Sequence, residues 1–519
     1  MAETNTADIG FEQQIWAAAD ILRGNMDAAE YKHVVLGLIF LKYISDKFGE
    51  RYQQLRDDKD DVEDKDAYTE VNVFYVPPVA RWDVIAEWAH KTGKITDQNG
   101  KEQFYDIGGI IDRAMRAIEK ENKRLKDILP KNYARSELDK RRLGNVVDLF
   151  TNIQMIEHGT DKDILGRTYE YCLSRFAELE GKRAGEFFTP SCVVRTLVEV
   201  LQPFQGRVYD PCCGSGGMFV QSADFVEHHS GSIGNLSIYG QDANPTTRKM
   251  ALMNLAIHGI EADLGGYNAD TFHNDLHPTL KADFIMANPP FNLSDWNDGS
   301  LNDDPRWKYG LPPSGNANFA WLQHMIHHLS PNGKIGMVLA NGSLSSQSGG
   351  EGDIRRRIVE DDLVEGIIAM PGQLFYTTPI PVSLWFLNRN KKQKGKTLFI
   401  DARKMGTMVN RRLREMTYQN EDGSDGDILK IAASFAAFNN GTLEDEKGYC
   451  AVVTTAEIAK QDYILTPGRY VGIEEQEDDG EPFEEKMVRL TGELSEMFER
   501  SHELEEKIRQ RMGAIGYDI

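Results

Sequence analysis

The chain has 519 residues, of which 40% are hydrophobic, and it carries a formal net charge of −22 at pH 7. This length exceeds what one ordinary core holds, so we expect two or three domains with the composition of a soluble globular protein. The acidity excludes a protein that binds nucleic acid through its overall charge, because phosphate binding draws on clustered Lys and Arg.

Cysteine and histidine usage indicates a reduced, cytoplasmic protein without a zinc site. The five cysteines include no CxxC pair, and two of them are adjacent. His158, His228 and His229 fall in no metal-ligand spacing. No secretory signal opens the chain, and the apolar stretch VVLGLIFL, which Lys42 follows, is far too short to span a bilayer.

Residues 1–165 are predicted to form an N-terminal helical domain. A charged break is expected at 50–70, and helical patterns return at 109–125 and 133–150. This domain is either a scaffold or a layer that covers the substrate or meets a partner, and the sequence leaves both open. Apolar residues repeat at helical spacing in two stretches: Phe11, Ile15, Ala18 and Leu22, then Tyr31, Val35, Leu38 and Leu41.

The segment GEFFTP at 185–190 precedes a predicted helix. Pro190 suits a first helical turn, and the following VVRTLVEVL places its apolar residues on one face. A short strand then ends at Asp210, and the Gly-rich turn DPCCGSGG leads into another helix. Glycines in this turn let the backbone bend tightly and approach a ligand closely. By itself, the turn would also suit a nicotinamide-dependent oxidoreductase.

Two further acidic residues follow the Gly-rich turn. The segment LSIYGQDANPTT predicts a second strand that ends at Gln241 and Asp242, where a carboxylate is placed to accept hydrogen bonds from a ribose. Asp270, in NADTF, follows an irregular Gly-Gly turn at 265–266 and is predicted to end a third strand.

The apolar run ADFIMA predicts a strand that ends in Asn288, Pro289, Pro290 and Phe291. Two prolines fix two φ angles and remove two backbone donors, so the corner presents acceptors. The Asn288 side chain and the Pro289 carbonyl can accept both hydrogens of an aromatic amino group, which favours its pyramidal, reactive form. Phe291 offers an apolar face to a planar base. An isolated NPP turn is commonplace, so its neighbours decide its meaning.

The rest of the α/β domain, expected over 166–472, follows the corner. Residues 292–315 form a long polar loop that contains Trp296 and Trp307, and we expect it to act as a lid. The strand GKIGMVLANG, the helix RRRIVEDDLVEGIIAM and strands around PVSLWFL close the domain. Three basic runs, KRRLGN, RRR and KKQKGK, are more often solvated faces than DNA-binding patches.

Residues 473–519 contain an acidic linker, EEQEDDGE, and a helix with a heptad seam. The helix either folds back on its own domain or, as we prefer, packs against helices of a partner. The seam consists of Phe483, Met487, Leu490, Leu494, Met497, Ser501, Leu504 and Ile508.

In this order, the segments GEFFTP, DPCCGSGG, GQDANP, ADTF and NPPF resemble the successive motifs of gamma-type amino-methyltransferases that use S-adenosylmethionine. The strongest resemblance is to the modification (M) subunit of Type I restriction-modification systems, a DNA adenine-N6 methyltransferase. It covers roughly residues 160–390 closely and both ends more loosely, including LTPGRYVG at 465–472. It implies an α/β, Rossmann-like methyltransferase sheet with an N-terminal helical domain and a C-terminal helical tail.

The resemblance also implies cofactor-binding residues. Asp242 would take the ribose hydroxyls of S-adenosylmethionine, and Asp270 the exocyclic amine of its adenine. Many relatives have Glu in place of Asp242 and other small residues in place of Cys212 and Cys213, but neither departure removes the cofactor. The methionine end would meet Glu186, Phe187, Phe188, Thr189, Pro190 and Ser191. The methionine and sugar would pass Asp210, Gly214, Ser215, Gly216 and Gly217.

The implied chemistry needs neither a metal nor a covalent intermediate, because a sulfonium methyl group is already activated. The enzyme must align the amine nitrogen, the methyl carbon and the sulfur, and the methylated amine can lose its proton afterwards. An adenine inside a duplex cannot reach such a pocket and must be extruded, and Phe291 would then replace about 1–3 kcal/mol of the lost stacking. The catalytic residues would be Asn288, Pro289, Pro290 and Phe291.

The implied partners are duplex DNA, a specificity (S) subunit and a second copy of the chain, in an assembly of two modification subunits with one specificity subunit. Restriction (R) subunits are left open, and no membrane is implied. The acidity fits this assembly if another subunit supplies most of the DNA grip and reads the target. No additional domain large enough to read a target follows NPPF.

Other readings of the same residues remain. A protein-glutamine or RNA-base methyltransferase would share the Gly-rich loop and the NPP corner. A cofactor-binding protein without catalysis is disfavoured by the intact Asn288, Pro289 and Phe291. A nicotinamide-dependent oxidoreductase would not explain NPPF.

Overall fold

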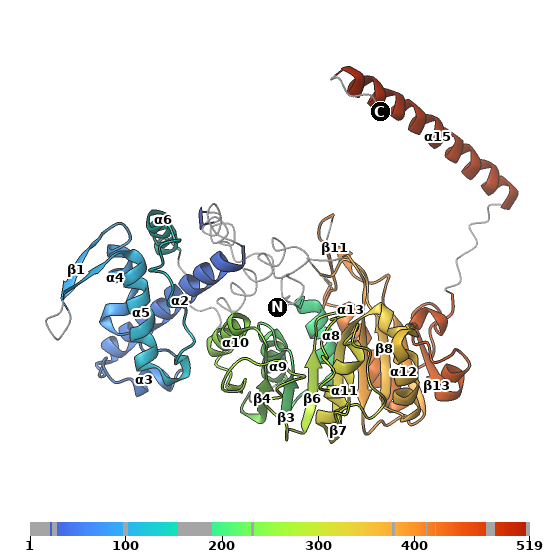
Figure 1. The fold of residues 1–519 in the computed structure, drawn as a ribbon, viewed down its shortest axis with the longest axis horizontal. Coiled ribbons are helices and arrows are strands. Elements are labelled where there is room, and N and C mark those ends of the chain that lie inside the picture. The colour runs from blue at the N-terminus through green and yellow to red at the C-terminus, as the bar shows by residue number, and fades with distance from the viewer. Residues whose placement is uncertain are drawn as a thin grey trace. The chain divides into compact units, whose positions relative to one another are not determined.

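The computed structural model describes residues 21–22, 28–96, 102–153, 189–229, 233–375, 379–411, 413–420, 422–473 and 483–514. The chain divides into two compact units, residues 1–472 and 473–519. The first unit contains a helical N-terminal part and an α/β part built on one large sheet (Figure 1). Among the described helices, none combines the length and the apolar character that a membrane crossing requires.

The N-terminal part packs its helices around an apolar core. Its helices include α2 (Ala28–Asp58), α3 (Asp66–Thr69), α4 (Trp82–Glu87), α5 (Ile107–Glu121) and α6 (Lys140–Thr151). Helix α5 begins after Asp106, whose side chain accepts a hydrogen bond from the Gly109 amide at 2.8 Å and so satisfies a free N–H of the first turn. The short hairpin of β1 (Gly93–Thr96) and β2 (Glu102–Tyr105) has no counterpart in the predicted pattern.

The predicted apolar stretches of this part are confirmed where they are described. Leu22 is buried, and Val35, Leu38 and Leu41 of α2 are fully buried. The charged break expected at 50–70 is wrong in its first half, because α2 continues to Asp58 with its charged side chains toward solvent. Phe11, Ile15 and Ala18 lie outside the described residues, as does the side chain of Tyr31.

The α/β part is organised by a nine-stranded sheet among the described residues, with strand order β13-β10-β8-β9-β7-β6-β3-β4-β5. All neighbours pair in parallel except at β9, which lies antiparallel between β7 and β8, and at the antiparallel edge strand β13. The bounds are β3 (Gly206–Asp210), β4 (Leu236–Gly240), β5 (Ala262–Asp263), β6 (Ala282–Ala287), β7 (Leu329–Ala340), β8 (Val364–Ala369), β9 (Val382–Asn388), β10 (Lys396–Asp401) and β13 (Cys450–Thr454).

Helices cover both faces of this sheet, as the α/β prediction requires. Because side chains alternate along a strand, Val208 and Tyr209 of β3 enter two different apolar cores. One core includes residues of α8 (Ser191–Leu201), α9 (Gly217–His228), α10 (Pro245–Ile257) and α13 (Asp427–Asn440). The other includes residues of α11 (Asn318–His328) and α12 (Glu351–Glu360).

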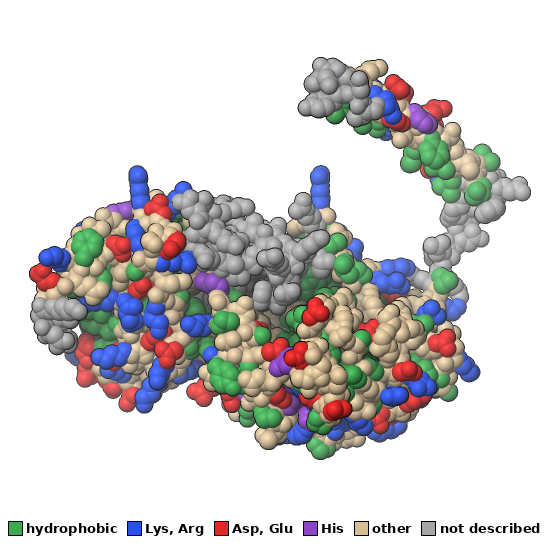
Figure 2. All heavy atoms as spheres, in the orientation of Figure 1, with side chains coloured by type: hydrophobic (Ala, Val, Ile, Leu, Met, Phe, Trp, Pro, Cys, Tyr) green, Lys and Arg blue, Asp and Glu red, His purple; other side chains and the backbone are tan. Residues whose placement is uncertain are grey.

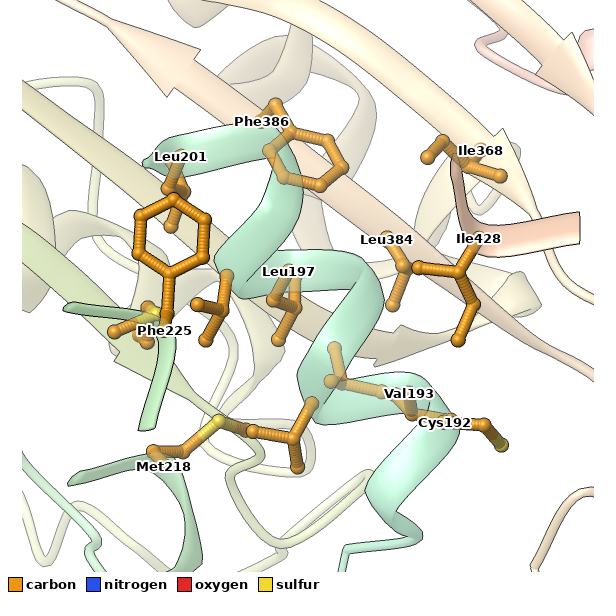
Figure 3. Close-up of a cluster of buried hydrophobic side chains, with 14 of the residues drawn as sticks. Cys192, Val193, Leu197, Leu201, Met218, Phe225, Ile368, Leu384, Phe386 and Ile428 are labelled. Carbon is orange, nitrogen blue, oxygen red and sulfur yellow. The ribbon is translucent and has the colours of Figure 1, made fainter. Parts of the chain in front are cut away.

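Helix α8 shows why the apolar stripe of VVRTLVEVL matters. Figure 3 shows Val193, Leu197 and Leu201 along this helix, with strand residues such as Leu384 and Phe386 on one side and side chains of α9 on the other. The predicted helix after Pro190 is confirmed. Its packing against the sheet fixes the position of Thr189 and Pro190, which precede it.

One predicted helix of the α/β part is wrong. The stretch RRRIVEDDLVEGIIAM was expected to be one helix, but α12 ends at Glu360 and the stretch from Val364 to Ala369 is strand β8. All six residues of β8 are buried, and a short, fully buried apolar run cannot be assigned to helix or strand by its periodicity alone. The strands predicted at GKIGMVLANG and PVSLWFL are confirmed as β7 and β9.

Candidate active site at the carboxyl edge of the sheet

The loops that carry the predicted motifs leave the sheet at one edge. Strands β3, β4 and β6 are mutually parallel, and they end at Asp210, Gly240 and Ala287. Their following loops therefore meet at the carboxyl edge of the sheet, where ligands bind in open α/β folds. The structure brings together the Gly-rich turn, Asp242 and the corner that begins at Asn288.

The Gly-rich turn is shaped by backbone conformations that favour glycine. Gly214 and Gly216 have φ angles of +53° and +80°, in the left-handed region. Gly216 precedes the first residue of α9, and no side chain caps that helix end. A Cβ at Gly217 would meet nothing within 4 Å, so open space lies in front of the first turn of α9. The amides of Cys213, Gly214 and Gly216 already donate to acceptors of this chain, so the turn offers a ligand a rigid backbone without side chains at its glycines.

Two carboxylates, the buried Asp210 and the half-buried Asp242, hold this turn in place. Asp210 is 2% exposed and accepts a hydrogen bond from the Cys212 amide at 3.0 Å. Asp242 accepts hydrogen bonds from the Gly214 amide at 3.1 Å and from the Asn244 amide at 2.8 Å. Burial raises the pKa of Asp210 to about 7 and that of Asp242 to about 6, because the charged forms lose hydration. Donors from a ligand would offset this cost for the ionised forms.

The segment after β5 is tied to the same edge of the sheet through contacts that the sequence does not reveal. Gln241 is fully buried, and its Nε2 donates to the carbonyls of Ala269 and Asn274, both at 3.3 Å. The Thr271 hydroxyl donates to the Pro211 carbonyl at 2.5 Å, which ties this segment to the Gly-rich turn. These supporting side chains were not predicted, because each acts on backbone that is distant in sequence.

Asp270 lies in this segment but not at a strand end, so that part of its prediction is wrong. Strand β5 ends at Asp263, and Gly265, with φ +70°, turns the chain away before Asp270. The exposed Asp270 side chain instead stabilises a turn. Its Oδ1 accepts hydrogen bonds from the amides of Phe272 and His273 at 3.0 and 2.9 Å.

Asn288 contains an unsatisfied polar atom at the corner. Its Nδ2 donates to the Thr189 hydroxyl at 3.0 Å, whereas its Oδ1 is buried without a hydrogen-bond partner among the described residues. A buried carbonyl oxygen without a partner is costly and calls for an external donor. The Thr189 contact also brings the GEFFTP segment against the NPPF corner. Asn288 Oδ1 is therefore ready to accept a hydrogen bond from a bound ligand.

The remaining corner residues shape an apolar wall. Pro289 is buried and Pro290 half-buried. Phe291 is half-buried and packs edge-on against Phe375, with ring centroids 6.3 Å apart. From the GEFFTP segment, Pro190 precedes α8 and Ser191 is its first residue, whereas Glu186, Phe187 and Phe188 lie outside the described residues.

The loop at 292–315 is packed against the α/β part in this structure, and its role as a lid stays a prediction. Trp296 and Trp307 are 4% and 8% exposed and pack edge-on against each other at 5.4 Å. The Trp296 indole donates to the Pro313 carbonyl at 2.9 Å, and the Trp296 ring lies 5.0 Å from that of Phe272. A loop that buries two tryptophans and satisfies their N–H groups is part of the wall of the site.

Arg306, in this loop, connects the loop to the segment after β5. Its buried guanidinium donates to the carbonyls of Thr271 and Phe272 at 3.2 and 2.5 Å and pairs with Asp304 at 2.7 Å. It also donates to Nδ1 of His324 at 3.1 Å. The loop after the corner and the loop after β5 are thus held as one piece.

A buried histidine cluster lies beneath this piece. Asp275, His324 and His328 bring potential metal-ligand atoms within 4.8 Å of one another. However, the Nδ1 and Nε2 atoms of His328 already face the Leu280 carbonyl and Asp275 at 3.0 and 2.8 Å. Burial lowers the pKa of His324 well below its ordinary value, and Arg306 would face any cation placed there. These contacts make the cluster a hydrogen-bonded support of the two loops.

The three basic runs are partly consumed by internal contacts. Lys140 donates to the Tyr133 carbonyl at 3.0 Å, and the fully buried Arg355 donates to the Tyr463 carbonyl at 2.7 Å. The buried Lys391 pairs with Asp362 at 2.6 Å. On the face drawn in Figure 2, blue and red side chains are interspersed rather than gathered by sign. These contacts support the structural interpretation of the three runs.

The second unit contains helix α15 (Phe483–Ala514). The described seam residues are exposed, at 43% for Met487 and Leu490, 50% for Leu494 and 66% for Met497. Leu504 and Ile508 are likewise more than half exposed, and the side chain of Phe483 lies outside the described residues. The helix thus carries an apolar stripe along its surface.

A doubly wound sheet whose carboxyl edge carries a Gly-rich turn beside an Asn-Pro-Pro-Phe corner defines an amino-methyltransferase. Residues 160–479 match the family described as N-6 DNA Methylase, and residues 11–150 match the HsdM N-terminal domain. The chain therefore belongs to the N-6 DNA methylase family, as a methylase subunit of a Type I restriction-modification system. It is a site-specific, adenine-directed DNA methyltransferase.

Individual relatives agree with this assignment. The HindI methylase subunit of a Type I restriction enzyme from Haemophilus influenzae is 51% identical over 85% of this chain and 100% of its own length. The MjaIX methylase subunit from Methanocaldococcus jannaschii is 40% identical over 98% of this chain and 92% of its own. The fold is also that of a type I methyltransferase subunit from Streptococcus thermophilus, with a TM-score of 0.70 at 24% identity, covering 89% of this chain and 98% of that one.

Proposed function

We propose that this subunit transfers a methyl group from S-adenosylmethionine to the N6 amine of an adenine extruded from duplex DNA. The observation that carries the proposal is the buried Oδ1 of Asn288, which lacks a partner among the described residues and follows directly on β6. An exocyclic amine would satisfy this oxygen, and the two prolines that follow, which lack backbone N–H groups, leave the corner with acceptors for such an amine.

The pocket residues fit S-adenosylmethionine by their chemistry. Asp242, with its pKa raised to about 6, offers a carboxylate that ribose hydroxyls would stabilise. Asp270 would accept from the cofactor's adenine amine through the part of its exposed carboxylate that the turn does not use. When bound, the cofactor supplies a methyl group on a positively charged sulfur. Its methionine end would lie at 186–191, and its sugar beside Asp210 and the turn from Gly214 to Gly217.

At the corner, residues of this chain would orient and polarise the amine. Asn288 Oδ1 and the Pro289 carbonyl accept its two hydrogens, so that the nitrogen lone pair leaves the ring system and faces the methyl group. Thr189 holds the amide of Asn288 with its oxygen available. Phe291 stacks on the base and offsets part of the stacking lost on extrusion. The methylated amine releases its proton after transfer, so no strong base is required.

We further propose that the chain acts with a specificity subunit and a second copy of itself, and that restriction subunits join that assembly. The exposed apolar stripe of α15 would pack against helices of the specificity subunit, which would also supply most of the DNA grip. A chain ending before residue 480 should bind S-adenosylmethionine normally but fail to assemble on size-exclusion chromatography. Retained assembly would show that the stripe serves another purpose.

The central test is the substitution Asn288→Ala. Loss of one preorganised hydrogen-bond partner at the reacting atom should lower kcat by about 10²–10³-fold, while the cofactor still binds. The assay is transfer of labelled methyl from S-adenosylmethionine to duplex DNA, with cofactor affinity from calorimetry. Asn440→Ala, at the exposed end of α13, is the matched control and should behave as the wild type. Near-normal turnover of the Asn288 variant would refute the role.

A further inference from the structure

A small two-stranded ribbon leaves the sheet on the same side as the catalytic corner. Strands β11 (Thr407–Met408) and β12 (Arg414–Glu415) pair antiparallel, Met408 opposite Arg414. The ribbon follows the end of β10, which is parallel to β8 and therefore runs in the same direction as β6 and β7. It therefore starts at the carboxyl edge, where the NPPF corner also lies. Figure 1 shows it as the projecting hairpin labelled β11.

The base of this ribbon is fixed to the wall of the corner. The Arg414 amide donates to the Gln373 carbonyl at 2.8 Å, and Gln373 lies in the turn that leads to Phe375. Phe375 in turn packs edge-on against Phe291 of the corner. The Arg414 guanidinium donates to the carbonyls of Met405 and Gly406, each at 3.0 Å, which joins the two strands at their base. The base of the ribbon is thus anchored, through Gln373 and Phe375, to the wall of the corner.

The tip combines apolar and basic side chains that the fold does not use. Met408 and Val409 are 43% and 54% exposed, and Arg411 is also exposed. Arg403 pairs with Asp401 at 2.5 Å and Arg414 donates to backbone carbonyls, and the acidic Glu415 lies in β12 opposite Thr407. Among the described residues of the tip, 408–411 and 413, Arg411 is the charged one, and its exposed guanidinium suits a polyanion. In contrast, Arg355 and Lys391 from the other basic runs are buried.

We propose that this ribbon is a DNA-contact element that acts during base extrusion, an inference that rests on the proposed function. Met408 and Val409 enter the space that the extruded adenine leaves in the base stack, and Arg411 contacts a neighbouring phosphate. Apolar side chains inserted between base steps and two-stranded ribbons placed in a groove are both established ways of engaging DNA. The anchor of the ribbon base on the segment of Phe375, which contacts Phe291, keeps the wedge on the side of the sheet where the base is received.

The wedge is tested with Met408→Ser/Val409→Ser in the chain assembled with its own specificity subunit. Methyl transfer is measured on a duplex with a paired target adenine and on one with an abasic site opposite that adenine. The variant should be slowed about tenfold on the paired duplex but less than about threefold on the abasic one, because an unpaired base costs less to extrude. The conservative variant Met408→Leu/Val409→Ile, which stays apolar, should keep the wild-type rate on both.

The phosphate contact is tested separately with Arg411→Gln. Loss of one phosphate contact should reduce the slope of log binding constant against log salt concentration by about 0.9. Lys394→Gln is the matched control, because Lys394 is exposed in the turn between β9 and β10, at the opposite edge of the sheet. It should leave the slope unchanged, and an unchanged slope in the Arg411 variant would overturn the phosphate contact.

The outcomes separate this proposal from the function on which it rests. Equal slowing of the serine variant on both duplexes, or no slowing on either, would overturn the wedge while leaving methyl transfer intact. Loss of assembly in the serine variant would assign the tip to a protein partner and also overturn the proposal. A wild-type assembly that methylates neither duplex would instead refute the proposed function, and the ribbon proposal with it.

Discussion

The two halves of the candidate site differ in how far the chain satisfies its own polar groups. On the cofactor side, Asp210 and Asp242 already accept backbone hydrogen bonds from the turn that they shape. On the base side, Asn288 Oδ1 is buried without such a partner among the described residues. The carboxylates of the first half are already hydrogen-bonded to the turn, although Asn254 Oδ1 beside that turn is also buried without a partner among the described residues. In the second half, the acceptor for the amine itself is left for the substrate. Substitutions should therefore affect binding on one side and turnover on the other.

The largest expected effect after that of Asn288 itself comes from Thr189→Val. Removal of the hydroxyl frees the Asn288 amide to rotate, so that its oxygen no longer faces the amine. Misplacement by about 1 Å can cost about 100-fold in rate, and we expect a loss of that order in kcat. Thr189→Ser retains the hydroxyl and should restore most of it. A loss confined to the KM for S-adenosylmethionine would instead place Thr189 on the cofactor side alone.

Asp242→Asn should act on the cofactor side of the site. The substitution removes the charged acceptor for the ribose hydroxyls. Cofactor binding should weaken by about 1.5–3 kcal/mol, that is about tenfold to 100-fold in Kd. The rate at saturating cofactor should change much less. Calorimetric titration with S-adenosylmethionine measures the first and a methyl-transfer assay the second. Asp263→Asn, at the end of neighbouring β5, is the control and should change neither.

The pH dependence of cofactor binding should follow the same carboxylate. The pKa of Asp242 is raised to about 6 by burial, so the side chain gains a proton as the pH falls below that value. Its ability to accept from two hydroxyls then declines, and we expect affinity to fall severalfold between pH 8 and pH 5. The Asp242→Asn variant should show a flatter profile, and an equally steep one would assign the titration to another group.

The smallest expected change concerns thermal stability. Burial raises the pKa of Asp210 to about 7, so between about pH 4 and pH 7 the folded state holds a proton that the unfolded state releases. Stability without cofactor should therefore decline as the pH rises through this range. Asp210→Asn carries no charge and should raise stability at pH 8 by about 1–2 kcal/mol. Thermal melts of both forms at pH 5 and pH 8 test this, and no gain at pH 8 contradicts it.

The sequence predicted the local part of this site well. The prolines after ADFIMA and the glycines after Asp210 act on the backbone where they stand, so the strand ends, the turn and α8 could be predicted from adjacent residues. Buried β8 was mistaken for a helix because an apolar run without alternation carries no period. The prolines and glycines could be interpreted because each acts on its own backbone, whereas the burial that makes β8 a strand depends on the neighbouring strands.

What could not be predicted depends on contacts across long stretches of chain. Thr189 and Asn288 are 99 positions apart, and Arg306 meets Thr271 and Phe272 from a loop that resembled a mobile lid. No spacing rule connects such residues, because the fold alone brings them together. The ribbon at 407–415 could not be predicted for the same reason, because its position depends on where the sheet places the end of β10.

The turn between β9 and β10 has a practical use, because it lies at the edge of the sheet away from the chemistry. Lys392 and Lys394 are exposed there, and a Cβ at Gly395 would meet nothing within 4 Å, although its φ of +67° favours keeping the glycine. A fluorescent dye coupled through a cysteine introduced at 394 would thus sit on a rigid scaffold without touching either half of the pocket. With a labelled oligonucleotide as the second dye, energy transfer would follow the binding and the dissociation of DNA.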